Sequence, residues 1–414
     1  MTTTTTAPER IAGTLLSELG ARPDRSRGFG AAAPVREGTV PMLGGAPSAD
    51  LLPLAAIREA AGALTADAPA LTAALQYSQP AGIGALREWI ARREGVAPHR
   101  VLVTNGAFHG LSLLVDALLD RGDEIIVEDP TYPLIFRNLQ HKESRLIPLA
   151  VTADGLDIDA LEARLDAGAR PKLLYTVPDF HNPTGLVTPA DQRARLVELA
   201  ERRGFLLVSD NAYAGLGFPG AEAPPADYPL DSELVAHVRT FSKVLGPGLR
   251  LGWLVLPDWL VAPVTRLRAN QDQHSSVLVQ SIVERIVGAG DHASVAGGFD
   301  AIADRARAAY AERFDLVASI LDQGVPGGIE VAHRTGGIFL WARLRAGDVA
   351  LAAAQHLART RYGTDAVLGR CFFLGDPEDD RGALRIGISH LPPEQLRVGA
   401  ERLVAALADP EARR

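Results

Sequence analysis

Cysteine, lysine and long apolar runs are what this 414-residue sequence has least of. Cys371 is the single cysteine, which excludes an internal disulfide framework and favours a reducing compartment, so we expect a cytoplasmic protein. Residues 1–10 lack the apolar core of a signal peptide, and no later stretch is long and apolar enough to span a bilayer. A net charge of −8 without a basic stripe argues against nucleic acid as a partner. We therefore expect neither membranes nor nucleic acids among the partners.

Lysine is so scarce that each one can be assessed separately. The chain has three lysines among its 42 basic residues, so arginine carries most of the positive charge. Lys142 lies in a polar run and Lys172 begins an apolar run, as surface and strand-edge lysines do. Lys243 lies in Thr-Phe-Ser-Lys-Val-Leu-Gly-Pro-Gly, residues 240–248. A lysine amine can lose its proton and attack a carbonyl to form a Schiff base, which a guanidinium cannot do at neutral pH. We predict that Lys243 is a nucleophile; the alternative is a solvated lysine in a turn.

Short apolar runs separated by helical patterns make up most of the chain. With 47% hydrophobic residues, a chain of this length can bury a large core and divide into two domains. Buried strands that alternate with helices predict a mostly parallel sheet covered on both faces, so we expect an α/β fold. The expected strands are residues 101–103, 124–127, 172–177, 205–208, 238–241 and 252–256.

A second, smaller unit is predicted after a long helical region at residues 264–321. Its strand patterns are residues 336–341 and 383–388, and a helix is expected between them over residues 350–361. The chain therefore has a large α/β part followed by a smaller part that mixes strands and helices.

The carboxyl ends of the parallel strands are where a ligand site is expected. Gly106 follows the first predicted strand and precedes a helix that begins near Ala107. A glycine turn at a helix start leaves backbone N–H groups unpaired at the positive end of the helix dipole, which suits a phosphate. Thr240 and Arg250, on either side of Lys243, would add a hydroxyl and a guanidinium. Helix capping alone is the alternative explanation for the glycine.

Two charged residues lie within or at the end of apolar strands, where an unpaired charge is costly. Asp210 follows the predicted strand that begins at Phe205 and requires a cation; the alternative is a helix N-cap. Arg385 lies inside an apolar strand and requires an anion; the alternative to a ligand is an ion pair with a neighbouring acid.

Four motifs connect these residues. They are Val-Pro-Asp-Phe-His-Asn-Pro-Thr-Gly at 177–185, Val-Ser-Asp-Asn-Ala-Tyr at 208–213, the lysine segment at 240–252, and Leu-Arg-Ile-Gly-Ile-Ser at 384–389. In this order and spacing they resemble the fold-type-I, pyridoxal-phosphate (PLP)-dependent aminotransferases of class I/II. The likeness is strongest to the branch of 2-aminoadipate and aromatic amino acid aminotransferases and to the effector domains of MocR-type regulators. It extends from about residue 44 to about residue 389.

The resemblance implies a fold and a division of the chain. The fold is the PLP-dependent transferase fold of type I, with a large domain around a mostly parallel central sheet flanked by helices and a smaller α+β C-terminal domain. The implied parts are a flexible N-terminal arm (1–30), a segment packed on the small domain and active site (31–55), the large PLP-binding domain (56–300) and the small domain (301–414). PLP is the expected cofactor, and no metal site is expected.

The resemblance also assigns a role to each candidate residue. Lys243 would hold the cofactor, Asp210 would face its pyridine nitrogen, and Tyr132 would stack on the ring; these three are the expected catalytic residues. The other expected cofactor contacts are Asn182, Tyr213, Gly106, Ala107, Phe108, Thr240, Ser242, Arg250 and, from a neighbouring subunit, Tyr77. The expected substrate-binding residues are Arg385, Asn182 and Gly45. Without the resemblance, Tyr132 would be read as a packing residue and Asn182 as a turn residue.

A homodimer with shared active sites follows from the same resemblance. Residues 77–82 and 273–276 are similar to family segments that reach across to the neighbouring subunit. Each site would then be completed by two chains in a two-fold arrangement.

The expected reaction is transfer of an amino group between an amino acid and a 2-oxo acid. Two departures from the family pattern keep a second reaction open: Phe108 and His109 stand where many relatives carry two glutamines, and Leu368 stands where proline is usual. His109 is either an extra base or a structural residue. The alternative enzyme carries out elimination, replacement or ring formation on an amino acid with a β or γ leaving group, such as S-adenosylmethionine. A non-catalytic, PLP-binding regulatory domain is a further alternative, disfavoured because no helix-turn-helix pattern precedes residue 44.

Overall fold

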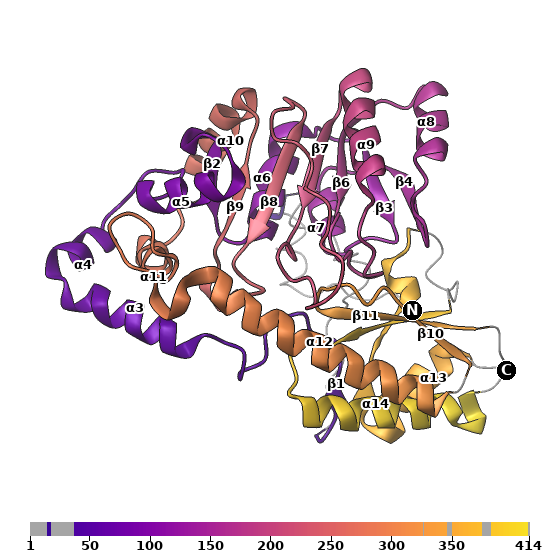
Figure 1. Cartoon of the computed structure of the whole chain (residues 1–414). Helices are drawn as coiled ribbons and strands as arrows, with labels where there is room; N and C mark the ends of the chain where they lie inside the picture. Colours follow the sequence, from indigo (N-terminus) through magenta and orange to yellow (C-terminus); the bar gives the residue numbers. More distant parts are fainter. Residues whose placement is uncertain (1–14, 18–36, 326, 346–349, 375–381, 413–414) are drawn as a thin grey trace.

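The computed structural model describes residues 15–17, 37–325, 327–345, 350–374 and 382–412. The described residues form two units, one around an eight-stranded sheet and one around a four-stranded sheet (Figure 1). The arm expected over residues 1–30 lies outside the described residues, apart from 15–17. No helix in the described ranges is long and apolar enough to cross a membrane.

The large sheet has the strand order β2-β9-β8-β7-β6-β3-β4-β5. Its strands are β2 Val101–Thr104, β3 Glu124–Asp129, β4 Arg145–Thr152, β5 Gly155–Leu156, β6 Pro171–Thr176, β7 Leu206–Asp210, β8 Val235–Thr240 and β9 Gly252–Val255. Neighbouring strands from β8 through β4 are parallel, whereas β9 is antiparallel to β2 and β8, and β5 is antiparallel to β4. This topology confirms the prediction of a mostly parallel sheet.

Helices cover both faces of the large sheet (Figure 1). The helices of the large unit are α3 Leu54–Ala66, α4 Ala68–Ala74, α5 Gly84–Glu94, α6 Ala107–Leu118, α7 Ile135–Gln140, α8 Ile158–Asp166, α9 Ala190–Arg203, α10 Asp258–Gln271 and α11 Val277–Val287. Among them, α3, α4 and α11 pack on one another beyond one end of the sheet (Figure 1). Successive residues of a strand point to opposite faces, and here they join different apolar clusters. Ile126 packs in the cluster that contains α8 and α9, whereas Ile125 and Val127 pack in the cluster that contains α6 and α7.

The smaller unit has an antiparallel sheet with the order β10-β11-β14-β13. Helix α12, Gly298–Gly324, runs along both units in Figure 1 and packs against α14. The helix expected over residues 350–361 is α13, Leu351–Leu357, continued by a π-helical stretch, Ala358–Tyr362. The remaining elements are β10 Ile329–Ala332, β11 Phe339–Leu344, β12 Thr364–Asp365, β13 Val367–Leu368, β14 Ala383–Gly387 and α14 Pro393–Ala408.

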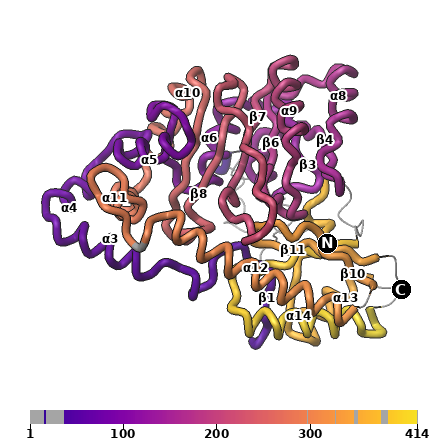
Figure 2. Tube along the Cα trace, viewed as in Figure 1, coloured from indigo at the N-terminus to yellow at the C-terminus, as the bar shows by residue number. Residues whose placement is uncertain are grey.

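The segment that precedes the large unit in the sequence packs on the smaller unit. Strand β1, Val40–Pro41, pairs in parallel with β12 and lies beside α14, where Figure 2 shows indigo next to yellow. The Met42 N–H donates to Asp365 O at 2.9 Å, and the Gly387 N–H donates to Met42 O at 2.8 Å. These contacts fix the residues that follow Met42 at the junction of the two units.

Candidate active site

A pocket of about 390 Å³ lies where β6, β7 and β8 end opposite the smaller unit. The sequence-predicted residues that line it are Gly45, Ala107, Phe108, Tyr132, Asn182, Asp210, Tyr213, Thr240, Ser242, Lys243, Arg250 and Arg385. Gly106 directly precedes the lining residue Ala107, and Tyr77 lies outside the pocket. Four separate sequence motifs therefore meet at one cavity.

Lys243 lies in the loop after β8 and reaches the N-terminal segment. Its Nζ donates to the backbone oxygen of Gly45 at 2.8 Å. Burial lowers the pKa of Lys243 to about 8, against the opposing influence of Asp210, and the positive charges of Arg385 and Arg250 add to the lowering. A lysine with a lowered pKa gives up its proton near neutral pH and becomes a nucleophile or a base.

Asp210 presents an unpaired carboxylate oxygen at the end of β7. Its Oδ2 accepts a hydrogen bond from the Tyr175 hydroxyl at 2.7 Å, whereas its buried Oδ1 has no hydrogen-bond partner. Burial raises the pKa of Asp210 to about 6, and the Tyr175 hydrogen bond and the Lys243 charge work against that increase. Asp210 ends a strand and a turn follows it, so the N-cap alternative is wrong. A buried carboxylate with a free oxygen can accept a hydrogen bond from a cationic ligand.

Gly106 shapes a backbone cradle at the start of α6. It is the N-cap residue of that helix with φ +84°, and no side chain caps the helix there. A Cβ on Gly106 would lie 2.7 Å from an Arg250 guanidinium nitrogen and would displace it, and the backbone at φ +84° and ψ 168° favours glycine at this position. Arg250 also donates to Asn105 O at 2.9 Å, and Thr240 Oγ1 donates to Ser242 Oγ at 2.8 Å. Free helix N–H groups, hydroxyls and a guanidinium together can hold a phosphate.

Arg385 joins the smaller unit to the pocket. It is 1% exposed, and its guanidinium donates to Asn182 Oδ1 at 3.0 Å and to Leu43 O at 2.9 Å. Asn182 in turn donates to the Tyr213 hydroxyl at 3.3 Å. Burial lowers the pKa of Arg385 to about 10, so it remains positively charged at neutral pH. The Arg385 guanidinium also lies 4.0 Å from the centre of the Phe339 ring.

The two pocket phenols have pKa values above the usual tyrosine range. Burial raises the pKa of Tyr132 and of Tyr213, and the negative charge of Asp210 adds to both increases. Both phenols therefore stay protonated and can donate hydrogen bonds at neutral pH.

Several pocket residues escaped the sequence reasoning. Tyr175 was read only as a strand residue, although it is the hydrogen-bond partner of Asp210. Tyr175 pairs with Val208 on the neighbouring parallel strand, two residues before Asp210, so Tyr175 and Asp210 lie on the same face of the sheet. This two-residue alternation is the signal that could have identified Tyr175. Phe339 packs over Arg385, and nothing in its sequence context distinguishes it from a core residue.

The contacts of His109 are those expected of a structural residue. Its Nδ1 accepts from the Asn105 N–H at 3.2 Å and lies 3.0 Å from an Arg268 nitrogen. Burial and Arg268 lower the pKa of His109, so the ring stays neutral. It does not line the described pocket, which supports the structural alternative over the extra base.

Comparison with known proteins places the chain in a family. The family model for "Aminotransferase class I and II" matches residues 46–403. The chain belongs to this family. The class I and II aminotransferases depend on PLP, so this chain is a PLP-dependent aminotransferase, as the sequence predicted.

Individual relatives agree with the family assignment. The chain is 31% identical over 381 residues to 2-aminoadipate transaminase of Thermus thermophilus, covering 90% of this chain and 91% of the relative. It is 28% identical to aromatic-amino-acid aminotransferase 1 of Thermococcus litoralis, covering 89% and 88%. The HTH-type transcriptional regulator TauR of Rhodobacter capsulatus is 31% identical, covering 78% of this chain but 64% of the regulator. Both branches named by the sequence motifs thus appear among the relatives.

A solved structure confirms the fold. The structure of α-aminoadipate aminotransferase LysN from Thermus thermophilus, bound to N-(5′-phosphopyridoxyl)-L-leucine, matches with a TM-score of 0.80 and 30% identity. The match covers 90% of this chain and 92% of that chain. The expected transferase fold of type I is therefore confirmed.

The described pocket fits PLP on its own chemistry. The unpaired Oδ1 of Asp210 suits a protonated ring nitrogen, and the glycine cradle at Gly106 with Arg250 suits the phosphate. Lys243, with its lowered pKa, suits the aldehyde. The ring nitrogen, the phosphate and the aldehyde of the cofactor thus each have a matching group at this pocket.

Proposed function

We propose that this aminotransferase holds PLP through Lys243 and moves the amino group of an α-amino acid to a 2-oxo acid. One observation carries the proposal: Lys243 with its lowered pKa, Asp210 with its unpaired oxygen and the buried Arg385 line the same pocket. Bound PLP supplies an electron sink for the charge that develops at the substrate α-carbon. Once the substrate amine has displaced it from the cofactor, Lys243 would be the base that takes the α-proton and delivers it in the next step.

Each further role rests on the contacts described above. Asp210, kept in place by Tyr175, holds the ring nitrogen protonated, and Tyr132 covers the ring. The proposed phosphate-binding residues are Gly106, Ala107, Phe108, Thr240, Ser242 and Arg250. Asn182 and Tyr213 bind the phenolic oxygen. Arg385 binds the substrate carboxylate with two parallel hydrogen bonds, assisted by Asn182 and the backbone at Gly45.

A homodimer is part of the proposal. Tyr77 is 84% exposed and lies with its ring edge against His274 at 6.0 Å between centroids, outside the pocket of its own chain. An exposed aromatic at this place is available to a second copy of the chain. We further propose the domain division at residues 55/56 and 300/301, the second of which falls in the first turn of α12. The single cysteine supports a location in the reducing cytoplasm.

A half-reaction tests the proposal. The PLP-loaded protein is mixed with one amino acid at a time and no acceptor, beginning with 2-aminoadipate and aromatic amino acids because the named relatives act on them. A correct donor converts the cofactor stoichiometrically to its amine form, and the donor appears as its 2-oxo acid. Adding a 2-oxo acid then restores the starting spectrum.

An elimination or replacement enzyme gives a different result. The substrate then loses its β or γ leaving group, and little of the amine form accumulates because the electrons depart with that group. Failure of every common amino acid to yield the amine form, together with rapid α-proton exchange on S-adenosylmethionine, would overturn the transfer reaction.

A further inference from the structure

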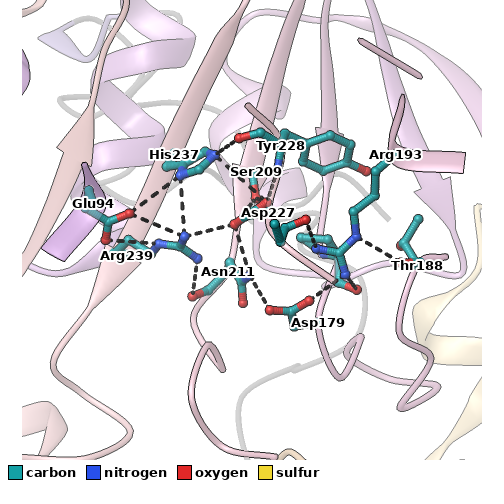
Figure 3. A network of polar contacts seen from close by, with 12 residues as sticks. Glu94, Asp179, Thr188, Arg193, Ser209, Asn211, Asp227, Tyr228, His237 and Arg239 are labelled. Atoms are coloured by element: carbon teal, nitrogen blue, oxygen red, sulfur yellow. Dashed lines mark hydrogen bonds and ion pairs between the residues drawn. The ribbon is translucent and has the colours of Figure 1, made fainter. Parts of the chain in front are cut away.

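The pocket has a buried polar cluster directly behind it. On β7 and β8, residues at the same register share a face and successive residues alternate, so Asp210 and Thr240 face the pocket. Asn211 and Arg239 face the opposite side, where Figure 3 shows them in one network. We call the charge frame the six residues Glu94, Asp179, Arg193, Asn211, Asp227 and Arg239.

Arg239 is the centre of the charge frame. Its guanidinium lies 2.9 Å from Asp227 Oδ2 and 3.4 Å from Glu94 Oε1, and it is 8% exposed. Burial alone would raise the pKa of Glu94, but Arg239 and His237 outweigh burial and bring that pKa to about 2. The pKa of Asp227 is also low, because His237 and Arg239 outweigh its burial. Both acids are therefore ionised at neutral pH.

The charge frame is bonded to the chain segments that carry the pocket residues. Arg239 NH1 donates to the backbone oxygen of Asn211, the residue after Asp210. The Asn211 amide donates to Asp179 at 2.6 Å and to Asp227 at 3.0 Å. Asp179 precedes Asn182 in the same loop. Asn211 donates to Asp179 Oδ2, and Arg193 donates to Asp179 Oδ1 at 2.6 Å. The ends of β7 and β8 and the Asn182 loop are thus tied together from behind.

The charge of the frame also acts on Asp210. Arg239 is one of the groups that lower the pKa of Asp210 against its burial. The titratable and charged groups that face Asp210 from the surrounding elements are Tyr175 on β6, Glu128 on β3, Arg239 on β8, Lys243 after β8, and the phenols of Tyr132 and Tyr213. Among these, Arg239 is the cation that lies on the face away from the pocket.

We propose that Arg239 and Glu94 are positioning residues that act through the sheet: Arg239 holds Asp210 in place and ionised, and Glu94 limits how strongly Arg239 does so. The inference rests on the proposed role of Asp210 as partner of the ring nitrogen. Removing the positive charge makes Asp210 harder to ionise. Removing the opposing negative charge makes it easier to ionise.

Removing the positive charge of Arg239 and removing the negative charge of Glu94 are predicted to shift the pH dependence of PLP affinity in opposite directions. The dissociation constant of PLP is measured with cofactor-free protein by equilibrium dialysis across a pH series. Wild-type affinity rises with pH through an inflection near the pKa of Asp210, about 6. Arg239→Gln moves the inflection to higher pH and Glu94→Gln moves it to lower pH, each by roughly half a pH unit. Arg239→Lys, which keeps the charge, leaves the inflection closer to wild type than Arg239→Gln does.

A purely structural network would weaken binding at every pH without moving the inflection, or would move it in one direction in both variants. Either result overturns the inference. If Arg239→Gln does not fold, as judged by circular dichroism, the isosteric Glu94→Gln variant decides alone, because Gln keeps an acceptor for Trp253 Nε1. Asp210→Asn separates the two proposals. The phosphate of PLP also titrates near pH 6, so the contribution of Asp210 is taken from the ratio of the wild-type and Asp210→Asn dissociation constants at each pH. A ratio that does not change with pH overturns the role of Asp210 itself.

Discussion

Arg385 is the residue that gives the pocket its anion-binding character. It is almost completely buried and its guanidinium already donates to two oxygens at the pocket wall, so its geometry is set before substrate arrives. We predict that Arg385→Ala raises KM by roughly 10- to 100-fold, which corresponds to about 1.5–3 kcal/mol for a charge-assisted pair. Arg385→Lys keeps the charge but cannot form two parallel hydrogen bonds, so its KM falls between that of the wild type and that of Arg385→Ala. An unchanged KM in steady-state assays of Arg385→Ala would remove the residue from the substrate site.

Tyr175 is predicted to tune Asp210 from within the pocket. Its hydroxyl stabilises the ionised carboxylate, so Tyr175→Phe raises the pKa of Asp210 above its present value of about 6. The ionised form exists only above that pKa, and the loss of PLP affinity on acidification therefore begins at a higher pH in the variant. Tyr228→Phe is the matched control, since Tyr228 is equally buried and the hydrogen bond to Asp210 Oδ2 comes from Tyr175. Identical pH profiles for Tyr175→Phe and wild type would contradict the account.

Helix α6 is predicted to bind the phosphate through its first turn. Gly106→Ala places a methyl group 2.7 Å from the Arg250 guanidinium and forces alanine to φ +84°, so PLP affinity falls by roughly tenfold or more. Gly204→Ala at the end of α9 is the control, because it carries a similar φ of +75° with open space around the new Cβ. Gly204→Ala loses about 1–2 kcal/mol of stability because Gly204 is in the left-handed helical region, with ψ +45°. Gly106→Ala loses more, because ψ 168° places Gly106 in a region that is almost restricted to glycine. Equal PLP affinities for the two variants, measured by dialysis, would exclude the cradle.

Among the strands, those buried along their whole length could be predicted from sequence, whereas a strand that is exposed on one face could not. Strands β3, β6 and β7 are buried on both faces, so their apolar runs were readable. Strand β4 alternates between buried and exposed residues and was missed. The pairing of β1 with β12 joins positions more than 300 residues apart, and no local pattern encodes such a contact. Residues with distinctive chemistry, such as Lys243 and Asp210, were predictable; Tyr175 was not, because a core aromatic looks the same in sequence.

The whole molecule is predicted to work as a pair of chains. If Tyr77 reaches the phosphate site of a second copy, Tyr77→Phe weakens PLP binding although the side chain is remote from the pocket of its own chain. Trp259→Phe is the control, because Trp259 is also exposed and its indole N–H donates to Glu233 O within its own chain. Analytical ultracentrifugation should show a dimer in the wild type. A monomer with full PLP affinity, or a Tyr77→Phe variant that binds PLP normally, would contradict a shared site.

The attachment of the cofactor is the central claim, and the scarcity of lysine makes it unusually easy to test. Lys142 and Lys172 lie in ion pairs with Asp116 and Asp123, whereas Lys243 lines the pocket. The PLP-loaded protein is reduced with borohydride, digested and mapped by mass spectrometry. We predict a single pyridoxyl label on Lys243 and no label in a folded Lys243→Ala variant. A label on Lys142 or Lys172 in the wild type would contradict it.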